Sequence, residues 1–495
     1  MMKILISSAL LLLCFGSLAQ QAVSIGSTNA DPAAILDVQS TQKGLLIPRL
    51  TSAQRNAMPN KAAGLLVYDT DKLTLMMYNG AAWTALIFGD PASLPPSYAE
   101  PATQIFGQGY GCSVSVWGNW AAVGAFGHRE QFESGDYGAV YMYERVSGVW
   151  QFRQLLKASD RASGDRFGTS VSLSGQALLV GASLADLPGK PDAGKAYTFR
   201  LSGQSWVQEK VLTASNSAAE DYFGSSVALS GGLGVVGAPG KEYLNQPPTR
   251  NNEGAIYVYR YADFVPELWV EDYRDTWDQG QGESRYGTSV AIDSAMGILV
   301  AGIPGSNAGR GTIAIKYRQS NPEWALTLYR TPPVPGAGAG RFGSSVSIRG
   351  LYIAVGSPFE AASINGNLVQ GTGRTYVYKN EFGSWNLYGD VPTPTAQAGD
   401  QIGASVAIFP PFLVVGMPGR TVNGLASQGQ TTVYRLGTSG PFNSPAWIFE
   451  RDITDGTNTA NNLFGSASAL HNGNLLTGGS FFQSGNGKVA FINIE

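Results

Sequence analysis

The sequence predicts an all-β protein: a seven-bladed β-propeller with four-stranded blades, preceded by a small, mostly-β N-terminal module. Three observations predict this fold: a composition rich in strand and turn formers, a repeat that occurs seven times, and four strand-like segments in each repeat. The 495 residues include 63 glycines, 26 prolines and 11% aromatic residues, which favours short strands and turns over long helices. With 43% hydrophobic residues, the chain can also bury large cores.

Charge excludes one class of partner. The 33 basic and 36 acidic residues leave a formal net charge of −3, and no run of Lys or Arg offers a surface that could neutralise phosphates. We therefore expect no nucleic-acid partner. No apolar run beyond the N-terminus reaches the length of a membrane span, so we expect no membrane span either.

The first residues have the three parts of a signal peptide. Lys3 supplies the positive charge, residues 4–15 are apolar, and Ser17-Leu18-Ala19 is a small-x-small cleavage site. We expect residues 1–19 to be removed and the protein to be secreted or displayed at the cell surface. Cys112 is then the only cysteine, so no disulfide can form within one chain.

Residues 20–88 form the predicted N-terminal module. Residues 65–68 and 75–78 indicate two paired strands around a turn at 69–72, and residues 52–58 indicate one or two helical turns. We interpret Arg49 and Arg55 as structural or solvated residues. A Pro-rich linker follows over 89–104, with prolines at 91, 95, 96 and 101.

The motifs of this module are LDV (36–38), KGLLIPR (43–49), TSAQRN (51–56), GLLVYD (64–69) and YNG (78–80). With them the segment resembles a short module at the head of surface and secreted proteins of Gram-negative bacteria and of phage tail-fibre-like proteins. The resemblance implies a structural or assembly element, sometimes in trimeric fibres. A homo-oligomer formed through this module is therefore an expected state of the protein.

Residues 105–495 contain the repeat. An aromatic residue and a glycine recur at intervals of 56 to 63 residues, with Ile402 in place of the aromatic residue in the sixth unit, so we expect blades to start near 110, 167, 223, 286, 342, 402 and 464. Glycines at such positions are expected where backbones approach closely or φ is positive. These repeat glycines are Gly111, Gly168, Gly224, Gly287, Gly343, Gly403 and Gly465.

Each unit continues in the same way. A second glycine follows 13 residues after the first, or 15 in the fourth unit, and then come a Gly-led alternating segment such as GAVYMY (138–143) and a Trp-led segment. Alternation with a period of two buries one face of a strand. Four short strands in about 60 residues are typical of a propeller blade.

These corners resemble the FG-GAP repeat family, the blades of the integrin α-subunit propeller. The second corner reads GAP at 237–239, GIP at 302–304 and GSP at 356–358. Many members carry an Asp/Asn-rich calcium site between the first two strands of a blade. Here those strands are joined by tight turns such as Ser174-Gly175-Gln176, and Asp293 is a single carboxylate, so we expect no metal and no cofactor.

The seventh unit has only three strand segments before residue 495, and a propeller with an incomplete last blade leaves a strand edge open. We therefore expect its fourth strand to come from the N-terminal side. Two segments could supply it, residues 98–106 or residues 83–88, and the position of 98–106 next to the first blade favours that segment.

No motif for catalysis is present. The two histidines, His128 and His471, lie in different units, and no G-x-S-x-G elbow, P-loop or H-E-x-x-H occurs. We therefore predict no catalytic residue and no enzyme. The remaining candidates for hydrolysis are carboxylates that we place in loops: Glu130, Glu133 and Asp136; Asp160 and Asp165; Glu220 and Asp221; Glu271, Asp272 and Asp275.

Binding is the favoured hypothesis, because the loops after the second strands are long, polar and rich in aromatic or basic residues. These loops are 126–137, 240–253 and 359–372, and their candidate contacts are His128, Arg129, Tyr243, Arg250 and Phe359. The sequence thus predicts a non-enzymatic binding or adhesion protein that recognises an extracellular protein or glycan. A structural subunit of a fibre or envelope assembly, and a carbohydrate-active enzyme using the carboxylates, stay open as alternatives.

Overall fold

The computed structural model divides the chain into two compact units, Met1–Asp90 and Pro91–Glu495. The expected signal peptide, residues 1–19, lies outside the described residues, as does most of the expected linker at 89–104. The structure describes residues 23–25, 34–42, 45–71, 74–86, 97–99, 109–130, 133, 135–242, 252–262, 269–278, 282–319, 324, 326–333, 338–364, 367–389, 391, 396–439, 444–456, 460–479 and 487–494.

The first unit is a small β structure with one short helix. Strands β1 (Val23–Ile25) and β2 (Leu36–Val38) form a parallel pair. A four-stranded sheet contains β3 (Arg49–Leu50), β4 (Leu66–Asp69), β5 (Thr74–Tyr78) and β6 (Trp83–Leu86). Helix α1 (Ser52–Ala57) begins with a capping box in which the Thr51 side chain and Gln54 bond reciprocally. The expected strand pair and helical turns are confirmed.

A buried ion pair fixes α1 on the sheet. The Arg55 Nε atom lies 3.1 Å from Asp69 Oδ2, and both side chains are almost fully buried. The Ser52 hydroxyl donates a hydrogen bond of 2.8 Å to the same carboxylate. Arg55 is therefore structural, as expected, whereas Arg49 at the start of β3 is exposed.

Within its described residues, the second unit contains seven four-stranded antiparallel sheets, so the all-β prediction is confirmed. The first three are β8 (Tyr110–Trp117), β9 (Trp120–Ala125), β10 (Ala139–Val146) and β11 (Val149–Leu156); β12 (Phe167–Ser174), β13 (Ala177–Ala182), β14 (Lys195–Ser202) and β15 (Ser205–Leu212); and β16 (Ser226–Ser230), β17 (Leu233–Ala238), β18 (Ala255–Tyr261) and β19 (Trp269–Thr276).

The next three sheets follow in chain order, with the short helix α2 (Ser306–Gly309) and the hairpin β26 (Ala362–Ile364) and β27 (Asn367–Val369) in their loops. Their strands are β20 (Val290–Asp293), β21 (Ile298–Ile303), β22 (Thr312–Tyr317) and β23 (Leu326–Arg330); β24 (Ser345–Arg349), β25 (Tyr352–Ser357), β28 (Arg374–Glu381) and β29 (Ser384–Leu387); and β30 (Ser405–Phe409), β31 (Phe412–Met417), β32 (Gln430–Ser439) and β33 (Ser444–Ile453).

The seventh sheet combines the two ends of the unit. It contains β34 (Ala467–His471), β35 (Asn474–Gly479), β36 (Lys488–Asn493) and, antiparallel to β36, the distant strand β7 (Ser97–Ala99). Of the two segments expected to supply this strand, the one beginning at Tyr98 pairs here, in register with Ala490. The other, at Trp83, belongs to β6 of the first unit.

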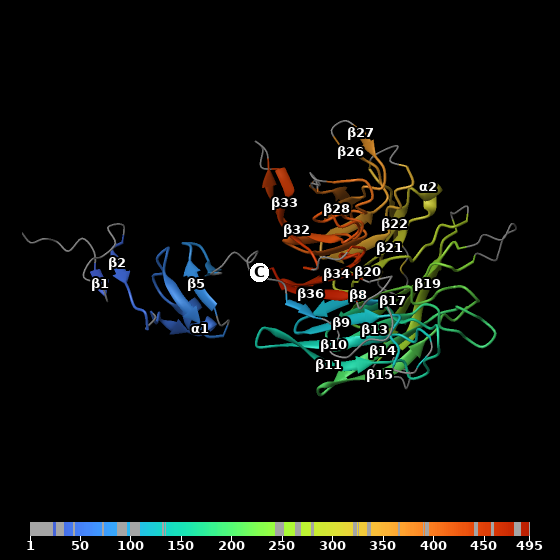
Figure 1. The fold of residues 1–495 in the computed structure, drawn as a ribbon, viewed down its shortest axis with the longest axis horizontal. Helices are drawn as coiled ribbons and strands as arrows, with labels where there is room; N and C mark the ends of the chain where they lie inside the picture. The colour runs from blue at the N-terminus through green and yellow to red at the C-terminus, as the bar shows by residue number, and fades with distance from the viewer. Residues whose placement is uncertain are drawn as a thin grey trace, which may run out of the picture. The chain divides into compact units, whose positions relative to one another are not determined.

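The first strands of the seven sheets contact one another in succession. β8 contacts β12, the series continues through β16, β20, β24 and β30 to β34, and β34 contacts β8 again. In Figure 1 the first strands β8, β20 and β34 lie toward the middle of the second unit, and the fourth strands β11, β15 and β33 lie toward its rim.

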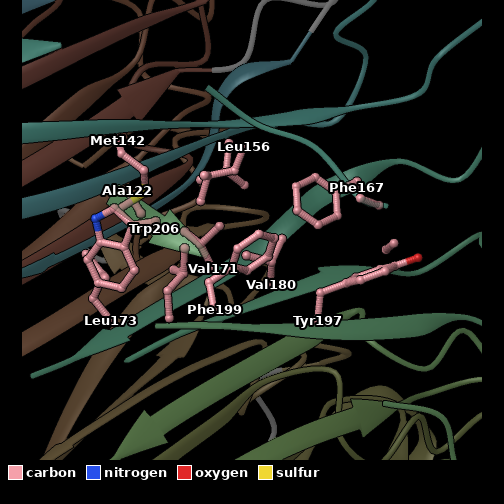
Figure 2. Close-up of a cluster of buried hydrophobic side chains, with 14 of the residues drawn as sticks. Ala122, Met142, Leu156, Phe167, Val171, Leu173, Val180, Tyr197, Phe199 and Trp206 are labelled. Atoms are coloured by element: carbon pink, nitrogen blue, oxygen red, sulfur yellow. The ribbon is translucent and has the colours of Figure 1, made fainter. Parts of the chain in front are cut away.

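The hydrophobic core lies between neighbouring sheets. Figure 2 shows one such layer, in which Met142 of β10 and Leu156 of β11 meet Phe167 and Val171 of β12. Trp206, from the Trp-led segment of the second unit of the repeat, packs in the same layer and is 2% exposed. The aromatic residues of the repeat therefore hold adjacent sheets together, because they bury large apolar surfaces between them.

The repeat glycines lie at close contacts between sheets. All seven have positive φ, between 84° and 92°. A serine two residues after the repeat glycine donates to the carbonyl of the repeat glycine in the next sheet, for example Ser226 Oγ to Gly287 O at 2.7 Å. Six junctions have this bond, whereas the junction of the seventh sheet with the first has Ala467 at the serine position.

Candidate functional site

The candidate site lies at the end of the sheets where the second strands end and the first strands begin; we call this end the loop face. The glycine corners bring backbone segments of adjacent sheets into contact here. A Cβ atom on Gly237 would lie 2.0 Å from the Gly287 carbonyl oxygen. The loops that follow the second strands therefore start from a rigid base, which suits a recognition surface.

The expected contact residues are distributed unevenly over this end. Arg129 is exposed, and Phe359 is 40% exposed. Tyr243 and Arg250 lie outside the described residues. His128 is only 4% exposed, and its Nδ1 atom lies 3.0 Å from the Tyr141 hydroxyl. Burial, together with the neighbouring Lys157 ammonium, lowers the pKa of His128 to about 4, so this imidazole is neutral and is not presented at the surface.

A hollow of about 580 Å³ opens on the loop face at Arg341. It is lined by Arg285, Arg341 and Glu283 together with the proline corners Pro239 and Pro304. The volume lies in the range of ordinary ligand pockets.

The two arginines of the hollow differ in their partners. The Arg285 guanidinium bonds Glu283 at 3.0 Å. The Arg341 guanidinium lies 5.0 Å from the centre of the Phe359 ring, and no carboxylate of the described residues pairs with it. An exposed cation beside an exposed aromatic ring is a combination that binding sites favour.

Arg341 belongs to a set that sequence reasoning missed. The residue before the aromatic-Gly pair is arginine in three repeats, and each of the three has left-handed backbone: Arg166 (φ 57°), Arg285 (φ 58°) and Arg341 (φ 55°). Backbone with positive φ is strained for residues other than glycine, and two of the three side chains, Arg285 and Arg341, line the hollow. The signal was present in the sequence as DRFG, SRYG and GRFG.

The carboxylates considered for catalysis are mostly committed to cations of the same chain. Glu133 pairs with Arg161 at 2.5 Å and Asp160 with Lys195 at 2.9 Å, and Lys157 pairs with Glu130. Asp221 is fully buried and accepts from Lys241 Nζ at 2.8 Å. Burial nevertheless raises the pKa of the Asp221 carboxyl.

One part of the carboxylate interpretation was wrong. Glu271, Asp272 and Asp275 were placed in a loop, but they lie within strand β19. Each has a basic residue near its carboxylate: Arg274 at 3.9 Å from Glu271, Arg260 at 3.2 Å from Asp272, and Lys316 at 2.8 Å from Asp275. Charged residues on this strand belong to the outer edge of the third sheet.

For metals, the described residues contain no group of three or more His, Cys, Asp or Glu side chains that could hold an ion. Asp293, the single carboxylate in a turn between first and second strands, accepts N–H bonds from Ala295 at 3.1 Å and from Gly350 at 2.8 Å. These bonds assign it a role in turn formation and in joining neighbouring sheets. Among the described helices, none is long and apolar enough to cross a membrane.

Comparisons with known proteins agree with both units. The family described as FG-GAP repeat matches residues 150–199 and 206–259, and the family described as phage tail like trimerisation region matches residues 24–97. The chain therefore carries FG-GAP repeats behind a phage tail like trimerisation region, as its corners and N-terminal motifs indicate. No curated protein matches the sequence.

A search of solved structures finds a similarity to hydrazine synthase of Kuenenia stuttgartiensis. The sequence identity is 12% and the TM-score is 0.48, with coverage of 81% of this chain and 100% of that one.

Proposed function

We propose that this protein is a secreted or cell-surface, non-enzymatic binding and adhesion protein. In this proposal the second unit is a seven-bladed β-propeller that recognises an extracellular protein or glycan through its loop face. The first unit joins copies of the chain into a homo-oligomer. The signal-peptide pattern of residues 1–19 supports export.

Two features support the propeller. Seven four-stranded sheets follow one another, and their first strands contact in a series that returns from β34 to β8. The seventh sheet takes β7 from the N-terminal side of the unit. A ring of blades needs such a shared last blade to avoid an open strand edge.

Exposed apolar side chains support the oligomer. Within the matched trimerisation region, large hydrophobic residues are exposed at Ile35 (81%), Leu45 (69%) and Leu46 (75%). Apolar groups gathered in one short segment mark a surface for association, because leaving them in water is unfavourable. A trimer would cover them with the same residues of two other copies.

The observation that carries binding is the hollow at Arg341. The exposed Arg341 guanidinium lines this hollow, no described carboxylate neutralises it, and it lies over the exposed Phe359 ring, which does not itself line the hollow. The carboxylate that lines this hollow, Glu283, is paired with Arg285, and candidate carboxylates elsewhere are committed to ion pairs, which supports recognition over hydrolysis. A structural subunit is the second candidate, because the trimerisation match by itself implies assembly.

The test is binding of the mature chain to an array of glycans and matrix proteins, with the Arg341→Gln variant beside it. Glutamine suits this position, because Gln401 occupies it in the sixth repeat with φ 58°. The control is Arg318→Gln, an exposed arginine after β22 at the opposite end of the sheets.

We expect saturable binding that Arg341→Gln weakens and Arg318→Gln leaves unchanged. Equal binding by both variants and the wild type would contradict recognition through the loop face. No binding to any array member would favour the structural subunit.

A further inference from the structure

The last residues of the seven first strands form a second group of side chains, at the opposite end of the sheets from the loop face. Each lies six residues after a repeat glycine and is the last residue of its strand. We call these residues the turn ring: Trp117, Ser174, Ser230, Asp293, Arg349, Phe409 and His471.

One half of the turn ring is aromatic. The His471 ring lies 4.3 Å from the Trp117 ring and 5.4 Å from the Phe409 ring, measured between centroids. The Arg349 guanidinium lies 4.6 Å from the centre of Phe409 and 5.9 Å from that of Trp117. Arg349 therefore contacts residues of the first and the sixth sheets from its own position in the fifth.

The other half is polar and joined through the turns. The Gly231 N–H donates to Ser174 Oγ at 3.2 Å, and Ser230 Oγ lies 2.9 Å from Ser294 Oγ. Asp293 follows in the fourth sheet, and its oxygens accept backbone N–H groups. Contacts thus link neighbouring sheets along this end of the unit.

A hollow of about 710 Å³ opens against the polar half. Five of its lining residues belong to the turn ring: Trp117, Ser174, Ser230, Asp293 and Arg349. The outer wall adds Gln176, Arg200 and Tyr261. The volume is suited to a small polar ligand.

Three charged side chains line this hollow, those of Arg200, Arg349 and Asp293. Arg200 is neutralised by Glu209 at 2.6 Å. Arg349 contacts two aromatic rings, and no carboxylate in the described part of the chain forms an ion pair with it. Asp293 does not offset Arg349 by direct pairing, since its hydrogen bonds go to backbone N–H groups. A half-buried guanidinium without a counter-ion attracts an anion.

We propose that this hollow binds an acidic sugar, with the sugar carboxylate on Arg349. The hydroxyls of Ser174 and Ser230 and the amide of Gln176 can both donate and accept hydrogen bonds, which suits a ligand carrying many hydroxyl groups. The partly exposed Trp117 provides an apolar wall for the C–H groups of the sugar ring. The site is independent of the loop face and of the partner bound there.

The test is calorimetric titration of the mature chain with a digalacturonate and with its methyl ester, which is the same sugar without the charge. The variant is Arg349→Gln, and the matched control is Arg435→Gln, whose guanidinium also lies over an aromatic ring, that of Phe412, but lines neither hollow. Urea unfolding of each variant shows whether it has folded. Arg349→Lys, which keeps the charge, supplies a second measurement at the same position.

We expect the free acid to bind with at least about tenfold higher affinity than the ester, and Arg349→Gln to remove this difference. Arg435→Gln should bind the acid like the wild type, and Arg349→Lys should retain part of the preference. Equal binding of acid and ester, no saturable binding of either, or undiminished binding by folded Arg349→Gln would overturn the proposal. Tighter binding of a sulfated disaccharide or of a glutamate-rich peptide would overturn the assignment to a sugar carboxylate.

Discussion

Gly237 leaves no room for a side chain at the junction between the third and fourth sheets of the second unit. A Cβ atom there would lie 2.0 Å from the Gly287 carbonyl oxygen and 2.4 Å from Ser226 Oγ, where ordinary contacts begin at 3.4 Å. The Gly237→Ala substitution must therefore push the fourth sheet away by about 1 Å or break the Ser226–Gly287 hydrogen bond.

The expected cost combines both effects. Overpacking against backbone costs about 3 kcal/mol, and the lost hydrogen bond adds about 1 kcal/mol, so the free energy of unfolding should fall by about 4 kcal/mol. Gly232 of the same sheet is the matched control, because its added Cβ would meet only the Tyr261 Cβ at an ordinary 3.6 Å. We expect Gly232→Ala to change the free energy of unfolding by less than about 1 kcal/mol.

Urea unfolding followed by tryptophan fluorescence measures both variants, because Trp269 of the same sheet is 2% exposed in the folded protein. Equal free energies of unfolding for Gly237→Ala and Gly232→Ala would refute the reasoning. The conclusion would be that the sheets are not held in backbone contact at the glycine corners.

Three further predictions use other features. Ala467→Ser should supply the hydrogen bond to the Gly111 carbonyl that the junction of the seventh sheet with the first lacks. The free energy of unfolding in urea should then rise by about 1 kcal/mol. A decrease would show that the serine hydroxyl does not reach the Gly111 carbonyl. Burial lowers the pKa of His128 in the folded protein to about 4, below the value of 6.5 in the unfolded chain. As the pH falls from 7 to 4.5, His128 is therefore protonated in the unfolded chain first, and the free energy of unfolding should fall by about 2 kcal/mol. A His128→Gln variant with the same pH dependence would contradict this. Replacing Leu45 and Leu46 by serine should dissociate the proposed homo-oligomer in light-scattering measurements, and an unchanged oligomer mass would locate its interface elsewhere.

The repeat could be predicted from the sequence because its constraints are steric. A glycine with positive φ, or one whose Cβ would strike a neighbouring carbonyl, admits almost no substitute, so its position recurs visibly in each unit. The strands follow the same logic, since one buried face imposes alternation. Glu271 and Asp275 were wrongly expected in a loop, because an outer-edge strand such as β19 carries charges at many positions and has the composition of a loop.

The sites were harder to predict, because function varies where the fold is constant. The residues of the turn ring occupy the same position in every repeat, but apart from the two serines each is a different amino acid: Trp, Asp, Arg, Phe or His. No sequence motif therefore marks the turn ring. His128 was expected at the surface but is buried. Lys241 and Arg420 occupy the same position in other repeats, and they too point inward, since they form ion pairs with Asp221 and Asp400. A comparison of positions across repeats, instead of a search for motifs, would have indicated both.

The shared seventh sheet sets an order on folding. Six sheets are each made from one continuous stretch of chain, and they can form as soon as that stretch has been synthesised. β7 leaves the ribosome before all of them, but its partner β36 follows all six sheets in the chain, so β7 must wait unpaired while those sheets are made. A binding protein that trapped β7 during this interval would leave the last sheet one strand short.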